Sequence, residues 1–140
     1  MPIHYALDPD LTVDEFVDIL RRSTLAERRP VGDSAAMAGM LEHADLILTA
    51  RTDDGKLVGI ARSVTDFHYC TYLSELAVDE SYQNQGIGKQ LIRRTHEAAG
   101  LDSNLILLSA PAAADYYPHI GMSPHKSSWV FWGEHCKANR

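Results

Sequence analysis

The segment 83–89, Gln-Asn-Gln-Gly-Ile-Gly-Lys, constrains the fold most, because its two glycines join a strand pattern to a helix pattern. Residues 71–78 before it alternate as a β-strand with both faces at least partly apolar. The apolar residues after it recur at helical spacing and stop at Gly100, which predicts a helix over about 85–99. A short buried strand is expected at 105–108. The order strand, helix, strand predicts a right-handed crossover between parallel strands.

The residues before this segment predict two helices. Thr12 and Glu15 match a capping box, and the apolar stripe that follows predicts a helix over about 13–22. Asp33 or Ser34 is suited to cap the second helix. Both helices are expected before any long strand.

Four further segments complete the expected order of elements. The strand patterns 45–51 and 57–64 flank an Asp-Gly turn, which predicts a hairpin. The alanine-rich stretch 110–114 begins a short helix that Pro118 ends, because proline in a helix interior costs about 3 kcal/mol. Residues 128–132 predict a final strand.

Length and composition place the chain among folded globular proteins. A chain of 140 residues has the usual size of one domain, which we expect to span 1–140. The apolar fraction of 45% and the charged fraction of 23% are ordinary for such proteins. The apolar runs fall far short of the ~20 residues of a membrane span, and the amino terminus lacks a basic and then apolar leader. We therefore expect a cytoplasmic protein without a membrane partner.

Charge and metal-binding side chains narrow the function further. Thirteen basic and 19 acidic side chains give a net charge of −6, which disfavours nucleic-acid binding through phosphate contacts. Cys70 and Cys136 have no CxxC partner and are expected to be reduced thiols. The seven histidines show no metal-ligand spacing, so no metal is expected.

The glycine segment predicts an anion site, because glycine lets the amides of a helix amino terminus approach a pyrophosphate. Two nucleotide motifs do not fit. A dinucleotide fingerprint needs Gly or Ala where Leu91 stands, and a P-loop needs Gly in place of Gln83 and Ser or Thr in place of Gln90. A plain strand-to-helix turn that binds nothing is the alternative.

A third pattern does fit. The chain resembles the GNAT superfamily of acetyl-CoA-dependent N-acetyltransferases in two blocks: Leu76-Ala77-Val78 with Gln83-x-x-Gly86-x-Gly88, and Tyr116-Tyr117-Pro118-His119-Ile120-Gly121-Met122. The two blocks span about 71–122, and the helices and hairpin upstream follow the family's order. The resemblance implies an α/β (α+β) fold, with a mixed, mostly antiparallel twisted sheet flanked by helices in a single domain.

The resemblance also implies a binding site for acetyl-CoA. The backbone amides of seven residues would hold the pyrophosphate: Gln83, Asn84, Gln85, Gly86, Ile87, Gly88 and Lys89. The strand edge at Leu76, Ala77 and Val78 would pair with the pantetheine arm, as an added strand does. An N–H near Leu76 or Val78 would stabilise the oxyanion. Many members carry a cofactor-contacting Asn where this chain has Ala110.

Two catalytic roles follow from the resemblance. Tyr117 stands where the family has the general acid that protonates the departing thiolate, and Tyr116 where it usually has a core aromatic. Attack needs a neutral amine, so a base or a water relay is required, and Glu75 is the nearest carboxylate in the sequence. Regular alternation points Glu75 away from Leu76 and Val78 unless a bulge re-aims it, so a structural ion pair is its alternative role.

The implied function is transfer of the acetyl group of acetyl-CoA to a primary amine, on a small molecule or a protein lysine, by direct attack and without a metal. A non-catalytic acyl-CoA sensor and a nucleotide-binding protein of unrelated chemistry are the alternatives. His68, Tyr69 and Trp129 are candidates for lining the acceptor site, and Arg28-Arg29-Pro30 lies where relatives commonly bind acceptors. The resemblance is also compatible with a homodimer, although no sequence feature indicates one.

Overall fold

The computed structural model describes residues 2–110 and 113–134. Its contacts separate into two compact units that divide between Leu107 and Leu108, and each unit is described by itself. The elements, with η for 3-10 helix, are β1 (Ile3–Leu7), α1 (Val13–Arg22), η1 (Leu25–Arg28), α2 (Ser34–Glu42), β2 (Leu46–Thr52), β3 (Leu57–Thr65), β4 (Cys70–Val78), η2 (Glu80–Tyr82), α3 (Ile87–Ala99) and β5 (Asn104–Ile106) in the first unit, and α4 (Tyr116–His119) in the second.

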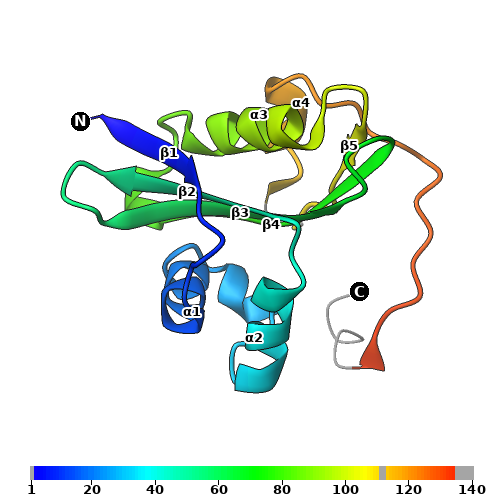
Figure 1. Ribbon diagram of the computed structural model, residues 1–140. Helices are drawn as coiled ribbons and strands as arrows, with labels where there is room; N and C mark the ends of the chain where they lie inside the picture. Colours follow the sequence, from blue (N-terminus) through cyan, green and yellow to red (C-terminus); the bar gives the residue numbers. More distant parts are fainter. Residues whose placement is uncertain (1, 111–112, 135–140) are drawn as a thin grey trace. The chain divides into compact units, whose positions relative to one another are not determined.

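One five-stranded sheet, in the order β1-β2-β3-β4-β5, forms the frame of the first unit. The strands β1 to β4 pair antiparallel, whereas β5 pairs in parallel with β4. Helices α1 and α2 lie on one face of the sheet and α3 lies on the other (Figure 1). The predicted hairpin, the parallel strands on either side of α3, and the mixed, mostly antiparallel sheet flanked by helices are thus confirmed.

An apolar core fills the space between the sheet and α1. Three side chains of α1 are fully buried, namely Phe16, Ile19 and Leu20. They pack with Leu11, Met37, Ile47, Leu57, Ile60 and Ala77. Burial of one such large side chain stabilises the fold by about 1.5–3 kcal/mol, so this face holds α1 on the sheet. Thr12 caps α1 as predicted: its Oγ1 accepts from the Glu15 N–H at 3.1 Å, and the Glu15 carboxylate accepts from Thr12 in return as well as from Arg51.

On the opposite face, Gly59 of β3 lets α3 approach the sheet closely. A Cβ atom at this position would lie 3.0 Å from Leu91 Cδ1 and 3.2 Å from Ile87 Cγ2. These are tighter than ordinary van der Waals contacts, so a larger residue would push the helix away. Because Ile87 and Leu91 belong to the first turns of α3, Gly59 helps to fix where that helix begins.

The structure differs from the expected strands at three places. The sequence pattern does not predict β1, a five-residue strand at the sheet edge that depends on pairing with β2. β5 ends at Ile106 and is not buried, because Ile106 is 54% exposed. Residues 128–132 form no strand, and Trp129 and Phe131 are 91% and 105% exposed. Alternating large side chains favour a strand only when a partner strand is present.

In the second unit, Pro118 lies inside α4 as its third residue and does not end it, contrary to expectation. In a first turn the missing N–H of proline costs no helix hydrogen bond. Gly121, at φ 91°, closes the turn: its N–H donates to the Pro118 carbonyl at 3.1 Å, and Met122 N–H donates to the Tyr117 carbonyl at 3.1 Å. These two bonds form a Schellman cap, which explains the spacing Tyr-x-x-x-Gly-Met.

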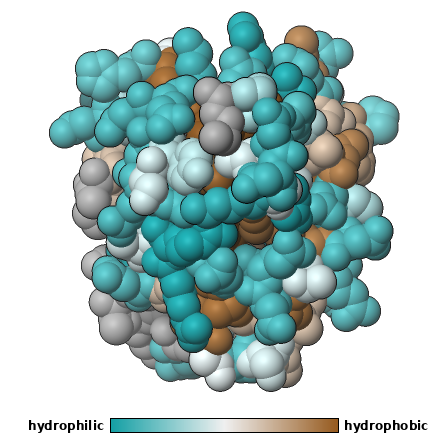
Figure 2. Space-filling model, turned by 90° about the vertical axis from the view of Figure 1, so that its left-hand side faces the viewer, coloured by the Kyte–Doolittle hydropathy of each residue, from teal (hydrophilic) through white to brown (hydrophobic). Residues whose placement is uncertain are grey.

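The surface seen from the side of β1 is mostly hydrophilic, with small separate hydrophobic areas (Figure 2). Large exposed apolar patches often mark interaction sites, and the described residues on this face form none of broad extent. Within residues 2–110 and 113–134, no helix is long and apolar enough to cross a membrane.

Candidate functional site

The turn before α3 contains backbone amides that have no acceptor within the helix. Gly86 caps the helix at φ 82°, in the left-handed region, and has no side chain to accept from the helix amides. Gln90 N–H donates to the Gly86 carbonyl at 3.1 Å, which closes the first turn of the helix. The amides of residues 87–89 therefore have no acceptor within the helix, and residues 83–86 are exposed. A helix start of this kind attracts an anion.

An open edge of β4 leads to this turn. β5 pairs only with Cys70–Tyr72, and in the described part of the chain no strand covers that edge over 73–78. Gln83 Nε2 donates to the Val78 carbonyl at 3.2 Å, so the backbone groups of Val78 point away from β3. Because this direction alternates along a strand, those of Leu76 point the same way. The edge therefore offers N–H and C=O groups next to the amides of the turn.

A β-bulge interrupts β4 at Ser74. Glu75 lies opposite Arg62 and Leu73 lies opposite Ser63, so Ser74 has no partner on β3. Arg62 and Ser63 are neighbours on β3 and point to opposite faces of the sheet, and so do their partners. The bulge thus turns the buried Glu75 to the face that carries α1 and α2, while Leu73 faces α3. The Glu75 side chain still points away from those of Leu76 and Val78.

Glu75 lies in a cluster with two arginines. Its side chain is 1% exposed; its Oε2 accepts from Arg29 Nε at 2.6 Å and its Oε1 accepts from Arg62 Nε. Ser74 Oγ also donates to Oε2 at 2.8 Å. Each carboxylate oxygen of Glu75 is thus bound by a guanidinium group of the protein itself. The cluster favours the structural role of Glu75 over that of a base.

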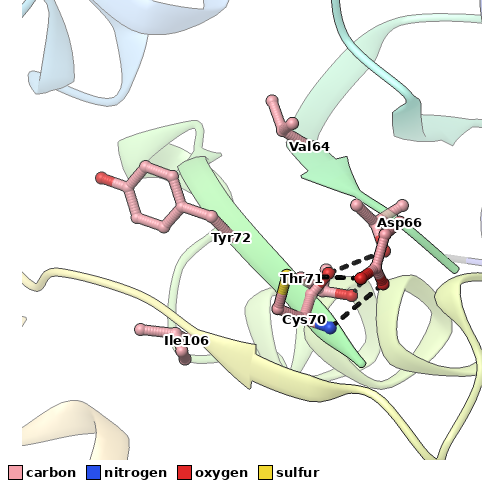
Figure 3. Close-up of a pocket in the computed structure, with 7 residues that line it drawn as sticks. Val64, Asp66, Cys70, Thr71, Tyr72 and Ile106 are labelled. Carbon is pink, nitrogen blue, oxygen red and sulfur yellow. Dashed lines mark hydrogen bonds between the residues drawn. The ribbon is translucent and has the colours of Figure 1, made fainter. Parts of the chain in front are cut away.

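A cavity of about 500 Å³ lies where β3, β4 and β5 meet. It is lined by Val64, Thr65, Asp66, Cys70, Thr71, Tyr72 and Ile106, and Figure 3 shows these side chains around it. The pKa of Asp66 lies well below its usual range, because the backbone N–H groups of Tyr69, His68 and Cys70 donate to its carboxylate. The cavity therefore combines apolar walls with one negative charge. His68 and Tyr69 themselves are not among the lining residues.

Tyr117 belongs to the second unit. Its ring stands edge-on to that of Tyr116, with ring centroids 5.3 Å apart. Burial, and to a smaller extent Tyr116, raises the pKa of Tyr117 above its ordinary value. The phenol therefore keeps its proton at neutral and mildly alkaline pH, as a proton donor must. Trp129, also predicted for the acceptor site, lies in the same unit.

Known proteins share this arrangement of strand, turn and helix. Residues 43–121 match the family model of the acetyltransferase (GNAT) domain. The chain belongs to the GNAT family. The match begins after α2 and runs through β2 to β5 and α3 to Gly121, so it includes the first block of the sequence motif and all of the second block except Met122. Membership supports acyl transfer as the general chemistry.

Individual relatives are distant. The GCN5-related N-acetyltransferase 2, chloroplastic, of Arabidopsis thaliana is 28% identical over 86 residues, which cover 59% of this chain but 33% of that protein's length. A GNAT family acetyltransferase from Streptococcus pneumoniae has a TM-score of 0.74 at 19% identity, over 94% of this chain and 97% of that one. An aminoglycoside acetyltransferase from an uncultured soil metagenomic sample has a TM-score of 0.66 at 21% identity, over 94% of each chain. These structures share the GNAT fold.

Sequence reasoning missed the residues that surround Glu75. The sequence indicates Arg29 only as part of a basic stretch, and it allows a bulge and an ion pair at Glu75 without indicating Ser74 or Arg62. The contact between Arg29 and Ser74 joins residues 45 positions apart, and neither residue belongs to the GNAT motif. The acidic position in the strand before the glycine turn is the signal that indicates an ion pair, but it does not say which basic residues form it.

Proposed function

We propose that this GNAT protein transfers the acetyl group of acetyl-CoA to a primary amine by direct attack. The observation that supports this most is that the open edge of β4 continues into the amides before α3. The edge at Leu76, Ala77 and Val78 suits the amide-bearing pantetheine arm, and the turn from Gln83 to Lys89 suits the pyrophosphate. One strand-turn-helix segment therefore offers hydrogen-bond partners both for the pantetheine arm and for the pyrophosphate.

The catalytic roles belong to the same proposal. An N–H of Leu76 or Val78 on the open edge stabilises the oxyanion, and Tyr117 protonates the departing thiolate. An alkylamine has a pKa of ~10.4, so it must lose a proton before it attacks. Because Glu75 is held by two arginines, a water relay is the proposed route for that proton.

A cationic acceptor, either a small molecule or a protein lysine, fits the charge of the protein. The carboxylate of Asp66 and the net charge of −6 both attract an amine in its protonated form. The cavity beside Asp66 lies on β4 ahead of the bulge, so an acceptor there lies on the strand whose edge we assign to acetyl-CoA. The similar fold of an aminoglycoside acetyltransferase supports an amine acceptor.

A thermal-shift titration with acetyl-CoA, compared with ATP and NAD, tests the proposed ligand. A ligand at 100 times its Kd adds about 2.7 kcal/mol to the free energy of unfolding, so we expect Tm to rise by several degrees with acetyl-CoA alone. A shift with ATP or NAD instead would favour the nucleotide-binding alternative. No shift with any of them would leave the two glycines as a plain turn.

A turnover assay with a panel of amines separates the enzyme from the sensor. Release of free CoA thiol is measured with acetyl-CoA and each amine in turn, and again without an amine. We expect at least one primary amine to raise thiol release above the rate without amine. Tight binding of acetyl-CoA with no turnover on any amine class would favour the non-catalytic sensor.

Gly86→Val is expected to raise the Kd of acetyl-CoA about tenfold or more, because valine at φ 82° strains the amide turn. A Cβ atom at Gly86 would meet nothing within 4 Å, so the effect comes from the backbone and not from a clash. Gly55→Val in the turn between β2 and β3 is the matched control, with φ 87° and equally open space. Equal binding by the two variants would contradict the assignment.

A further inference from the structure

Arg29 makes three contacts from the loop between η1 and α2. Its Nε donates to Glu75 Oε2 at 2.6 Å, its Nη2 donates to the Ser74 carbonyl at 2.8 Å, and its Nη1 donates to the Arg28 carbonyl at 2.9 Å. The side chain is 20% exposed. One planar guanidinium therefore joins its own loop to two successive residues of β4, in a geometry that a single ammonium group cannot reproduce.

The contact with Ser74 falls on the bulge of β4. Ser74 has no partner on β3, and β5 pairs with β4 only up to Tyr72. Its carbonyl therefore accepts from a side chain at a point where the strand ladder provides no partner. The backbone that follows carries the open edge at Leu76 and Val78, so the shape of the bulge determines how that edge is presented.

Arg62 completes the cluster from β3. Its Nε donates to Glu75 Oε1, and its Nη1 donates to the Met40 carbonyl in α2 at 3.1 Å. Arg62 is 10% exposed, so its charge depends on the Glu75 carboxylate for compensation. The loop before α2 and the helix itself are thus both connected to the bulge, one through Arg29 and the other through Arg62.

We propose that Arg29 is a positioning residue, which sets the open edge of β4 from the loop between η1 and α2 with Glu75 as the bridging carboxylate. This inference rests on the proposed function, because it assigns the edge to acetyl-CoA. Arg29 acts through the backbone of Ser74, and Arg62 keeps Glu75 in place. Loss of Arg29 therefore weakens acetyl-CoA binding beyond what its effect on stability explains.

The test compares Arg29→Met and Arg29→Lys with Arg51→Met. Arg51 of β2 is a matched control. Its side chain is 27% exposed and pairs with two carboxylates, that of Asp8 at 3.2 Å and that of Glu15 at 2.9 Å. The Kd of acetyl-CoA, its KM, kcat and Tm are measured for each variant. We expect Arg29→Met to raise Kd and KM about tenfold, as loss of hydrogen bonds to charged groups does.

Arg51→Met is expected to lower Tm to a similar extent and to leave Kd and KM unchanged. Arg29→Lys is expected to restore part of the affinity, since its ammonium replaces one of the two contacts with β4. Equal Kd and KM for Arg29→Met and Arg51→Met would overturn the inference. If Arg29→Met does not fold, wild-type Kd and KM in Arg29→Lys would overturn it as well. Failure of the wild type to bind acetyl-CoA would instead overturn the proposed function.

Discussion

Tyr117→Phe is expected to lower kcat about 100-fold or more, while the Kd of acetyl-CoA and Tm stay close to those of the wild type. The substitution removes one hydroxyl and keeps the ring, so it removes the proposed proton donor for the departing thiolate and little else. Tyr116→Phe is the control, because it makes the same change in the adjacent ring. Wild-type turnover in Tyr117→Phe, or an equal loss in both variants, would show that Tyr117 is not the acid.

The pH profile tests the same assignment. Because burial and Tyr116 raise the pKa of Tyr117, its phenol stays protonated while the acceptor amine loses its proton. We therefore expect kcat/KM of the wild type to rise with pH and to show no decline at any pH lower than about 10. A fall near pH 8 that is absent in Tyr117→Phe would contradict the raised pKa.

Glu75→Gln is expected to lower Tm by about 10 °C or more, because loss of the charge leaves the buried Arg62 uncompensated. Breaking one partner of a buried ion pair costs about 3–5 kcal/mol. Thermal unfolding followed by far-UV circular dichroism measures the change. If Glu75 has a structural role, any loss of turnover in Glu75→Gln is expected to be accompanied by weaker acetyl-CoA binding.

A second substitution separates the two roles of Glu75. Arg62→Met in the Glu75→Gln background removes the uncompensated charge, so the double variant is expected to be more stable than the sum of the single effects. An unchanged Tm and unchanged acetyl-CoA affinity in Glu75→Gln, together with abolished turnover, would instead make Glu75 the base.

Features set by neighbours in the sequence could be predicted from it. The Thr12 cap, the stripe of α1 and the Asp-Gly hairpin each depend on residues a few positions apart. The same holds for the turn at Gly86, whose positive φ and open amides follow from strand, glycine and helix in succession. The GNAT blocks are also local in sequence, so the pattern of residues is enough to find them.

Features set by distant partners could not be predicted. β1 exists because β2 pairs with it, and Glu75 is buried because Arg29 and Arg62 reach it from other elements. The bulge at Ser74 follows from the register between two strands and not from a glycine or another local signal. Residues 128–132 show the opposite case: they have the alternation of a strand, but they form no strand in the structure.

The exposed aromatic segment in the second unit makes intrinsic fluorescence a local probe. Both tryptophans of the chain, Trp129 and Trp132, lie there, so the first unit contains none. Emission excited at tryptophan's absorption edge therefore originates from residues 129–132, and none of it originates from the core around Phe16. A ligand-dependent change in that emission would locate an effect in the second unit, whereas melting of the sheet must be followed through tyrosine or backbone signals.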